Sequence, residues 1–298
     1  MIRRMLPTFV HIGLPESPFG ARFAEAVRSL GIAAETASID ATIEGGTVTV
    51  RPDAVLWEKI PLLDAVAVVV EAPLFPWPQP LGAAPRGAGG AAPLPFAVER
   101  EARSLALSAL SLVAESRPVW NRPAAAHLAA SRAVALARLE TAGIPVRAWK
   151  LLPAPERGDR EDGIILDSVG RDRWHRPSRP SPGEPALVLG PVAGDVVSVL
   201  VAGGAAAGGE RHPSAAAWSS GSPGAPLASA AVPKPLADAA IAAARALGLD
   251  IAAVALAGDP AATLLVETGP DLSVWDDLLD GGLAPFLAGR LAAAALAR

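Results

Sequence analysis

Apolar residues in the first 75 positions recur with the periods of short strands and one helix. Residues 7–14, PTFVHIGL, form an apolar run typical of a buried strand. Residues 21–31, ARFAEAVRSLG, have the spacing of an amphipathic helix that ends at its glycine. Further strand candidates lie at residues 33–40, 47–50, 55–59 and 65–71. This order predicts a small doubly wound α/β unit over residues 1–75.

Helical and strand patterns return after residue 95. Residues 123–142 predict one helix, because Pro123 stands near its start and Gly143 follows its end. The remaining helical patterns cover residues 96–115, 235–247 and 281–298. Strand patterns cover residues 117–121, 144–152, 186–192, 195–207, 251–258 and 262–270. We therefore expect a mixed α/β and α+β chain.

Proline, glycine and alanine dominate residues 76–95, which we interpret as a linker between two units. The second unit then covers residues 96–298. Residues 153–185 are rich in proline, glycine, arginine and aspartate and have few apolar runs. We expect a reduced central part, a shortened lid, within residues 150–232.

Composition excludes several kinds of site and partner. The chain of 298 residues has no cysteine, so disulfides, thiolate catalysis and cysteine-ligated metals are excluded. A formal net charge of −4 predicts no broad attraction to nucleic acid. No membrane helix is predicted, because the most apolar long window contains Asp195, a proline and many glycines. The first residues lack the pattern of a signal peptide, and we expect a cytoplasmic protein.

Four segments in order resemble the ATP-grasp superfamily, particularly the RimK-like carboxylate-amine ligases. The segment at 96–132 is similar to the family's helix, its v.N.p strand end and the next helix, and LETAGIPVRAW at 139–149 resembles L..aGipvP.T. The segment DVVSVLVAGGAAAGGERH at 195–212 resembles the family's d.RvlVvgg.vvaa..R strand pair. The segment at 243–275 resembles a..LGld.aGvDll....g..vlEvN..P.l.

The resemblance implies a fold in which two α+β subdomains hold ATP between them. It also implies a reaction in which ATP phosphorylates a carboxylate and an amine attacks the acyl phosphate. Such chemistry depends on cations at the phosphates and on Mg²⁺ held by oxygen ligands. The implied cofactors are therefore ATP and Mg²⁺, and the implied substrates are a small-molecule carboxylate and an amine.

The metal ligands that the resemblance implies are incomplete. Glu267 matches the glutamate of the family's EvN, but Gly269 stands at its asparagine and Ala255 stands at the aspartate of GvDll. Asp259 and Asp271 lie near enough in sequence to substitute if a loop shifts. Glu267 is our candidate metal and nucleotide ligand, and a lone carboxylate holds Mg²⁺ weakly.

The phosphate-binding cations that the resemblance implies are altered as well. Arg132 stands at the family's first lysine, where arginine keeps the charge but changes the geometry. The second lysine has no counterpart in residues 163–185, although Arg173, His175 and Arg176 could supply cationic contacts. Arg211 matches the family's arginine near the transferred phosphoryl group or the substrate carboxylate, and it is our candidate catalytic residue.

Simpler structural explanations stand beside these roles. Glu267 is also explained as a strand-end carboxylate that lies in water or pairs with an arginine such as Arg211. Arg132 is also explained as an exposed helix arginine. His11 and His127 have no second ligand at metal spacing, so we interpret both as structural.

Two functions remain open from the sequence. The substitutions favour a degenerate module that has lost most or all turnover and acts as a binding or scaffold subunit, with a protein partner or a second copy of itself. The alternative is an active ATP- and Mg²⁺-dependent ligase in which Arg211 and Arg132 bind phosphates and Glu267 binds Mg²⁺.

Overall fold

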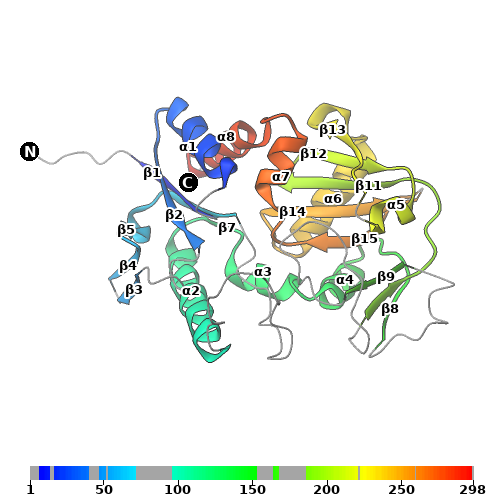
Figure 1. Ribbon diagram of the computed structural model, residues 1–298, viewed down its shortest axis with the longest axis horizontal. Helices are drawn as coiled ribbons and strands as arrows, with labels where there is room; N and C mark the ends of the chain where they lie inside the picture. The colour runs from blue at the N-terminus through cyan, green and yellow to red at the C-terminus, as the bar shows by residue number, and fades with distance from the viewer. Residues whose placement is uncertain are drawn as a thin grey trace, which may run out of the picture.

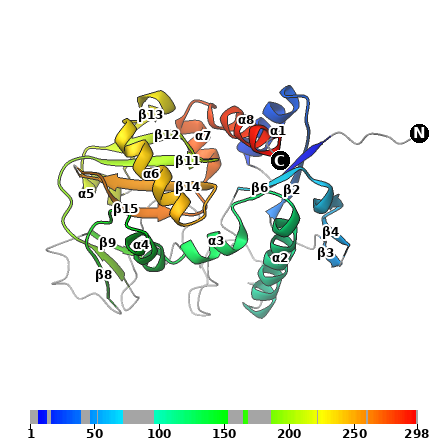
Figure 2. The ribbon, with the colours of Figure 1, turned by 180° about the vertical axis from the view of Figure 1, so that it is seen from behind.

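The computed structural model describes residues 7–13, 17–39, 47–51, 53–71, 96–152, 164–167, 186–220, 222–258 and 260–296. Two α/β parts lie side by side (Figures 1 and 2). One is built on a parallel sheet near the N-terminus and the other on an antiparallel sheet formed by the second half of the chain. The predicted linker at 76–95 lies outside the described residues.

The N-terminal sheet has four strands in the order β2-β1-β6-β7, and each neighbouring pair is parallel. The strands are β1 (Thr8–Gly13), β2 (Ala33–Ser38), β6 (Ala67–Val70) and β7 (Val119–Trp120). Alternate residues of β1 face opposite layers: Phe9 packs against helix α1 (Pro18–Ser29), and Val10 packs with helix α2 (Phe96–Ser116). The predicted doubly wound unit is therefore present.

This sheet extends beyond the residues expected for the N-terminal unit. Helix α2 and strand β7 follow residue 95, yet α2 covers one face of the sheet and β7 pairs with β6. A small antiparallel meander is attached to the sheet, formed by β3 (Val48–Arg51), β4 (Ala54–Trp57) and β5 (Ile60–Pro61), followed by the short helix η2 (Leu62–Asp64). The first unit thus includes residues on both sides of the predicted linker.

The core sheet of the second part has five antiparallel strands in the order β13-β12-β11-β14-β15. They are β11 (Val196–Ala202), β12 (Ala205–His212), β13 (Ala225–Ala228), β14 (Ile251–Ala257) and β15 (Ala262–Glu267). Helix α6 (Lys234–Ala246) packs on one face. Because residues alternate along each strand, Val199 faces α6 while Leu200 packs with the C-terminal helices.

A smaller antiparallel sheet lies beside the core sheet, in the order β8-β10-β9 (Figure 1). Its strands are β8 (Trp149–Leu152), β9 (Ile164–Asp167) and β10 (Ala186–Leu189). The reduced central part predicted at 150–232 therefore divides: the segment up to residue 189 forms this small sheet, and β11 to β13 join the core sheet. Helix α5 (Ala215–Ser219) and the short helix η4 (Ser229–Ala231) lie within the second segment.

The helix predicted over residues 123–142 is wrong in one respect, because the structure has two helices there. Helix α3 (Pro123–Ala129) ends before Ser131, and helix α4 (Arg132–Thr141) starts at the next residue. Alanine-rich sequence propagates helix well, so the pattern alone does not mark the interruption. The break buries Arg132, which is 6% exposed, whereas the simpler explanation had placed it on an exposed helix surface.

Two helices close the described chain, α7 (Leu272–Leu278) and α8 (Leu283–Leu296). Fully buried Asp276 accepts hydrogen bonds from the backbone N–H groups of Leu283 and Ala284 and so caps α8. Arg22 of α1 lies 2.5 Å from the same carboxylate. Among the described residues no single helix has the length and hydropathy to span a membrane, and α7 with α8 meets those criteria only as a pair bent by 116°.

Asn121 connects the two parts of the chain. Its side-chain amide donates to the carbonyl oxygens of Ile251 and Thr268 at 2.6 and 2.7 Å. Its oxygen accepts from the backbone N–H groups of Asp250 and Ile251 at 2.7 and 2.6 Å. Asn121 is 8% exposed. Its side-chain NH₂ donates two hydrogen bonds and its side-chain oxygen accepts two, so both groups are fully used. It therefore positions the start of β14 and the turn after Glu267 relative to the N-terminal sheet.

A second connection is a buried polar cluster at the carboxyl ends of β1 and β6. His11 Nε2 lies 3.1 Å from Glu71 Oε2, and these residues are 1% and 3% exposed. Glu71 Oε1 accepts hydrogen bonds from Ser17, before α1, and from Ser273, in α7. A Cβ at Gly13 would overlap the carboxylate, so glycine is required for the cluster. Burial opposes ionisation, but the contacts with His11, Ser17 and Ser273 leave the pKa of Glu71 below its ordinary value.

We expect Asn121→Ala to lower the free energy of unfolding by about 3 kcal/mol or more, because two buried N–H groups and two carbonyls lose their partner. Urea unfolding followed by circular dichroism measures this change. Arg122→Ala is the control, since that neighbouring side chain is exposed and its removal changes stability by about 0.5 kcal/mol at most. Equal effects of the two substitutions would contradict the role given to Asn121.

The cluster around Glu71 also predicts a pH dependence. A carboxyl group whose pKa is lower in the folded state stabilises the protein above its unfolded pKa, and that stability is lost as the pH falls through the folded pKa. We expect Glu71→Gln to be less stable than the wild type at pH 7 and to lose less stability below about pH 4.3, the ordinary glutamate pKa. Unfolding curves across pH measure this, and Glu35→Gln, on exposed β2, is expected to follow the wild type.

Candidate functional site

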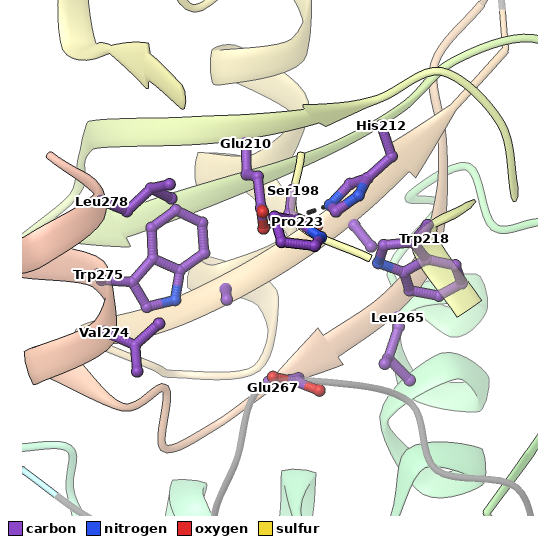
Figure 3. A pocket seen from close by; sticks show the side chains of 12 residues that line it. Ser198, Glu210, His212, Trp218, Pro223, Leu265, Glu267, Val274, Trp275 and Leu278 are labelled. Atoms are coloured by element: carbon purple, nitrogen blue, oxygen red, sulfur yellow. Dashed lines mark ion pairs between the residues drawn. The ribbon is translucent and has the colours of Figure 1, made fainter. Parts of the chain in front are cut away.

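A cavity of about 190 Å³ lies over one face of the core sheet, between α5 and α7 (Figure 3). Strands β11, β12, β14 and β15 supply its floor, and the two helices supply apolar walls. The lining residues are Ser198, Glu210, His212, Trp218, Pro223, Ala253, Ala255, Leu265, Glu267, Val274, Trp275 and Leu278. Among the sequence-predicted site residues, Glu267 is the one that lines it.

The floor follows from the register of the antiparallel strands. Ser198, Ala255 and Leu265 lie side by side on β11, β14 and β15, and Ala253 lies directly opposite Glu267. Ala255, at the expected metal-binding aspartate, is thus on the same face of the sheet as Glu267, two residues further along β14 than Ala253. Methyl groups occupy both β14 positions beside the carboxylate, so this strand offers it no second acidic ligand.

Glu267 forms an ion pair with Arg132. The distance from Arg132 Nη2 to Glu267 Oε1 is 3.6 Å, and the two side chains are 7% and 19% exposed. The break between α3 and α4 places Arg132 in the first turn of α4, from which its side chain reaches the end of β15. The sequence had allowed Glu267 to pair with an arginine such as Arg211, but the structure pairs it with Arg132. Two of the three candidate residues therefore meet.

Arg211 lies elsewhere, because it faces the opposite side of the core sheet. It lines a shallow hollow with Gly194, Leu236 and Gly258, and its side chain is 45% exposed. Its Nε lies 3.9 Å from Asp195 Oδ2. Since successive strand residues point to opposite faces, the residues before and after Arg211 face the cavity instead.

Those two neighbours, Glu210 and His212, were not among the candidates from the sequence. His212 Nε2 lies 3.3 Å from Glu210 Oε2, and their side chains are 4% and 17% exposed, respectively. Glu210 Oε1 accepts a hydrogen bond of 2.6 Å from the backbone N–H of Gly224. Alternation along the segment GGERH could have indicated them, had the orientation of the strand been known.

Two tryptophans stand at the ends of the cavity. Trp218 comes from α5 and Trp275 from α7, and Figure 3 shows them on opposite sides of Glu210 and His212. Helix α7 was not predicted from the sequence. Asp271 caps it by accepting hydrogen bonds from the N–H groups of Ser273 and Val274, so the aspartate considered as a substitute metal ligand serves as a helix cap.

The described residues contain no cluster of three or more histidine, aspartate or glutamate side chains that could hold a metal. Asp259, Arg173, His175 and Arg176, which the sequence raised as candidates, lie outside the described residues. Usual Mg²⁺ sites combine carboxylates with phosphate oxygens. A single carboxylate already paired with Arg132 does not fit the three Mg²⁺ ligands that the resemblance implied, at positions 255, 267 and 269.

Solved ATP-grasp structures are similar to this chain over nearly its whole length. The ATP-grasp ligase PsnB in complex with a phosphomimetic minimal precursor, Mg and ADP has a TM-score of 0.69 and 17% identity, with 96% of this chain and 98% of that chain covered. A RiPP-associated ATP-grasp ligase from Chryseobacterium gregarium, in complex with ADP and a leader and core peptide, has a TM-score of 0.68, 12% identity and coverage of 97% of both chains.

A RimK-domain ATP-grasp protein from Sphaerobacter thermophilus has a TM-score of 0.57 and 18% identity, with 94% of this chain and 98% of that chain covered. No protein-family model matches the sequence, and no curated protein matches it. The chain therefore has the ATP-grasp fold, which confirms the fold expected from the four sequence segments.

Removing one partner of the Arg132–Glu267 pair leaves a largely buried charge. We expect Arg132→Met and Glu267→Gln each to lower the free energy of unfolding by about 2–3 kcal/mol, a value reduced from the fully buried case because Glu267 is partly exposed. The double variant is expected to be more stable than the sum of the two losses predicts. A urea double-mutant cycle measures the coupling, with exposed Arg138→Met of the same helix as control; additive losses would contradict the ion pair.

Proposed function

We propose that this chain is a degenerate ATP-grasp module that acts as a peptide-binding subunit with weak or no turnover. The observation that carries the proposal is the state of Glu267. This acidic residue at the expected metal site pairs with Arg132 and has methyl groups across from it on β14. Arg132 in turn stands where a phosphate-binding lysine was expected. Each group thus satisfies the other's charge.

The energetics support the same conclusion. Phosphoryl transfer requires the protein to neutralise developing charge with metal ions and cationic side chains. An Arg132 that served a phosphate would have to leave Glu267, and a Glu267 that served Mg²⁺ would have to leave Arg132. If either group took a new partner, the other would be left as a largely buried, uncompensated charge, which costs several kcal/mol and would weaken nucleotide binding by that amount.

A peptide is the partner class that the comparisons support. Solved structures with this fold are complexed with precursor peptides, including PsnB and the macrocyclase MdnC from Microcystis aeruginosa. Those proteins are ligases or macrocyclases, and structures of PsnB also contain Mg and ADP. We infer that this chain has kept a surface for a peptide while its nucleotide chemistry has been lost.

Titration with Mg-ATP tests the proposal. We expect no rise in melting temperature at millimolar Mg-ATP, because a ligand that binds only the folded state at a hundred times its dissociation constant would add about 2.7 kcal/mol and be visible. The measurement is differential scanning fluorimetry with and without Mg²⁺. A Mg²⁺-dependent shift that Glu267→Gln abolishes would overturn the proposal in favour of the active ligase.

Restoring the expected ligands gives a complementary test. We expect the double variant Ala255→Asp with Gly269→Asn to gain a Mg²⁺-dependent shift with ATP, because it returns an acidic and an amide oxygen beside Glu267. Ala255→Asn with Gly269→Asn is the control of matched size without the added charge. A double variant that folds and still ignores Mg-ATP would show that these substitutions are not what prevents binding.

A further inference from the structure

One ring nitrogen in the wall of the cavity lacks a hydrogen-bond partner. His212 lines the cavity and is 3% exposed. Within the described residues, its Nδ1 is the one buried side-chain nitrogen or oxygen of the lining that has no hydrogen-bond partner. A buried polar atom without a partner is costly, and it is satisfied when a polar group is brought beside it. Nδ1 of His212 is therefore a point at which a ligand with one polar group gains a hydrogen bond.

A hydroxyl group can pair with this nitrogen whatever the state of the ring. An imidazole nitrogen either carries a proton and donates, or carries a lone pair and accepts. An ammonium group can only donate, and a carboxylate can only accept. A hydroxyl group does both, because it is one donor and two acceptor positions that rotate to suit the partner. One hydroxyl is enough, since one buried atom of the lining lacks a partner.

The charges at the cavity favour a neutral ligand. Two carboxylates, those of Glu210 and Glu267, line it and repel an anion. Both already have partners in the chain: Glu267 is paired with Arg132, and Glu210 accepts from Gly224 N–H and lies 3.3 Å from Nε2 of His212. A cation would have to compete with these contacts. A neutral ligand avoids both the repulsion and the competition.

The apolar walls and the size of the cavity suit a single aromatic ring. The larger apolar lining side chains are Trp218, Pro223, Leu265, Val274, Trp275 and Leu278. Figure 3 shows the two indoles at opposite ends of the space, and aromatic rings pack on one another in offset or edge-to-face arrangements. A cavity of about 150 Å³ holds a benzene ring, so the 190 Å³ here suits a ring that carries one hydroxyl. A small aliphatic alcohol would cover little of the two indoles.

From these observations we infer that the cavity binds a neutral phenol, with its ring between the walls formed by Trp218 and Trp275 and its hydroxyl hydrogen-bonded to Nδ1 of His212. Nδ1 lies just below the cavity surface, so binding includes a rotation of the imidazole or of a side chain beside it, as is common at binding sites. The inference rests on the proposed peptide-binding function, because it names a tyrosine side chain as the part of the peptide that enters the cavity. A free phenol shares this chemistry.

Calorimetric titration of the full chain without nucleotide tests the inference. The probe is p-cresol, which has the ring and hydroxyl of a tyrosine side chain. Toluene is the matched compound without the hydroxyl, and 4-methylbenzoate and 4-methylbenzylamine are the charged comparisons. We expect p-cresol to bind about tenfold more tightly than toluene, since it adds one hydrogen bond to a buried atom, and more tightly than either ion.

A second pair of probes distinguishes the two sources of a phenol. N-acetyl-tyrosinamide carries peptide groups on both sides of the side chain, and N-acetyl-phenylalaninamide is its counterpart without the hydroxyl. We expect the tyrosine derivative to bind more tightly than the phenylalanine derivative. Tighter binding of N-acetyl-tyrosinamide than of p-cresol would assign the cavity to a peptide, and the reverse order would assign it to a free phenol.

Variants locate the hydrogen bond. We expect His212→Phe to raise the dissociation constant of p-cresol about tenfold and to leave that of toluene within about twofold, so that the preference for the hydroxyl disappears. His212→Asn keeps a polar atom near the position of Nδ1 and should retain part of the preference. Trp218→Leu removes a wall and should weaken both ligands alike. His127→Phe makes the same change on an exposed residue of α3 and should alter neither.

Equal binding of p-cresol and toluene by the wild type would show that water, and not a ligand, satisfies Nδ1, and would overturn the inference even if no variant at position 212 folds. Tighter binding of either ion than of p-cresol would overturn it as well, as would a hydroxyl preference that His212→Phe leaves intact. The outcome is separable from that of the proposed function. A Mg-ATP-induced melting shift overturns the loss of nucleotide binding, whereas the p-cresol titration, made without nucleotide, decides this inference alone.

Discussion

The hydrogen bonds of Asn121 are the constraint on which the arrangement of the two parts depends. One side chain at the end of β7, in the N-terminal sheet, contacts the backbone at the start of β14 and the turn after β15. That turn follows Glu267 and leads into α7. The position of the acidic residue and the position of the Trp275 wall are therefore both set by an amide that belongs to the other sheet. The cluster of His11, Glu71 and Ser273 fixes the same helix from a second direction.

The two faces of the core sheet have separate chemistry because strand residues alternate. Helix α6 and its alanine-rich surface cover one face, where Arg211 and Asp195 pair at the exposed edge of a shallow hollow. The other face carries the cavity, with Glu210 and His212 from the same strand. Strand β12 therefore turns Arg211 toward one face of the sheet and Glu210 with His212 toward the cavity.

Glu267 and Arg132 compensate each other's charge within the protein. A largely buried carboxylate beside Ala253 and Ala255 would be costly without a cation near it. Arg132 of α4 supplies a cation at 3.6 Å from that carboxylate. We interpret the ion pair as an arrangement in which each of the two largely buried charges is compensated by a side chain of the same protein.

Helices α1, α2, α6 and α8, most strands of the two large sheets, the ATP-grasp resemblance and the substitutions at Ala255 and Gly269 were readable from the sequence, because they depend on local periodicity and on residue identity at matched positions. The break before Arg132 was not readable, since alanine-rich segments on both sides favour helix equally well. The packing of α2 and β7 on the N-terminal sheet could not be predicted either, because the composition of a linker does not indicate which sheet the elements after it join.

The sequence by itself determined which side chains are present, and the tertiary structure alone decided which of them meet. Glu267 and Arg132 are 135 residues apart by their numbers, and no local pattern links them. Whether Arg211 or its neighbours face the cavity depends on which side of the sheet is covered by α6, which only packing establishes. Distant segments come into contact because the apolar faces of sheets and helices are buried against one another. Which faces meet is decided by the fold of the whole chain and cannot be inferred from a short segment.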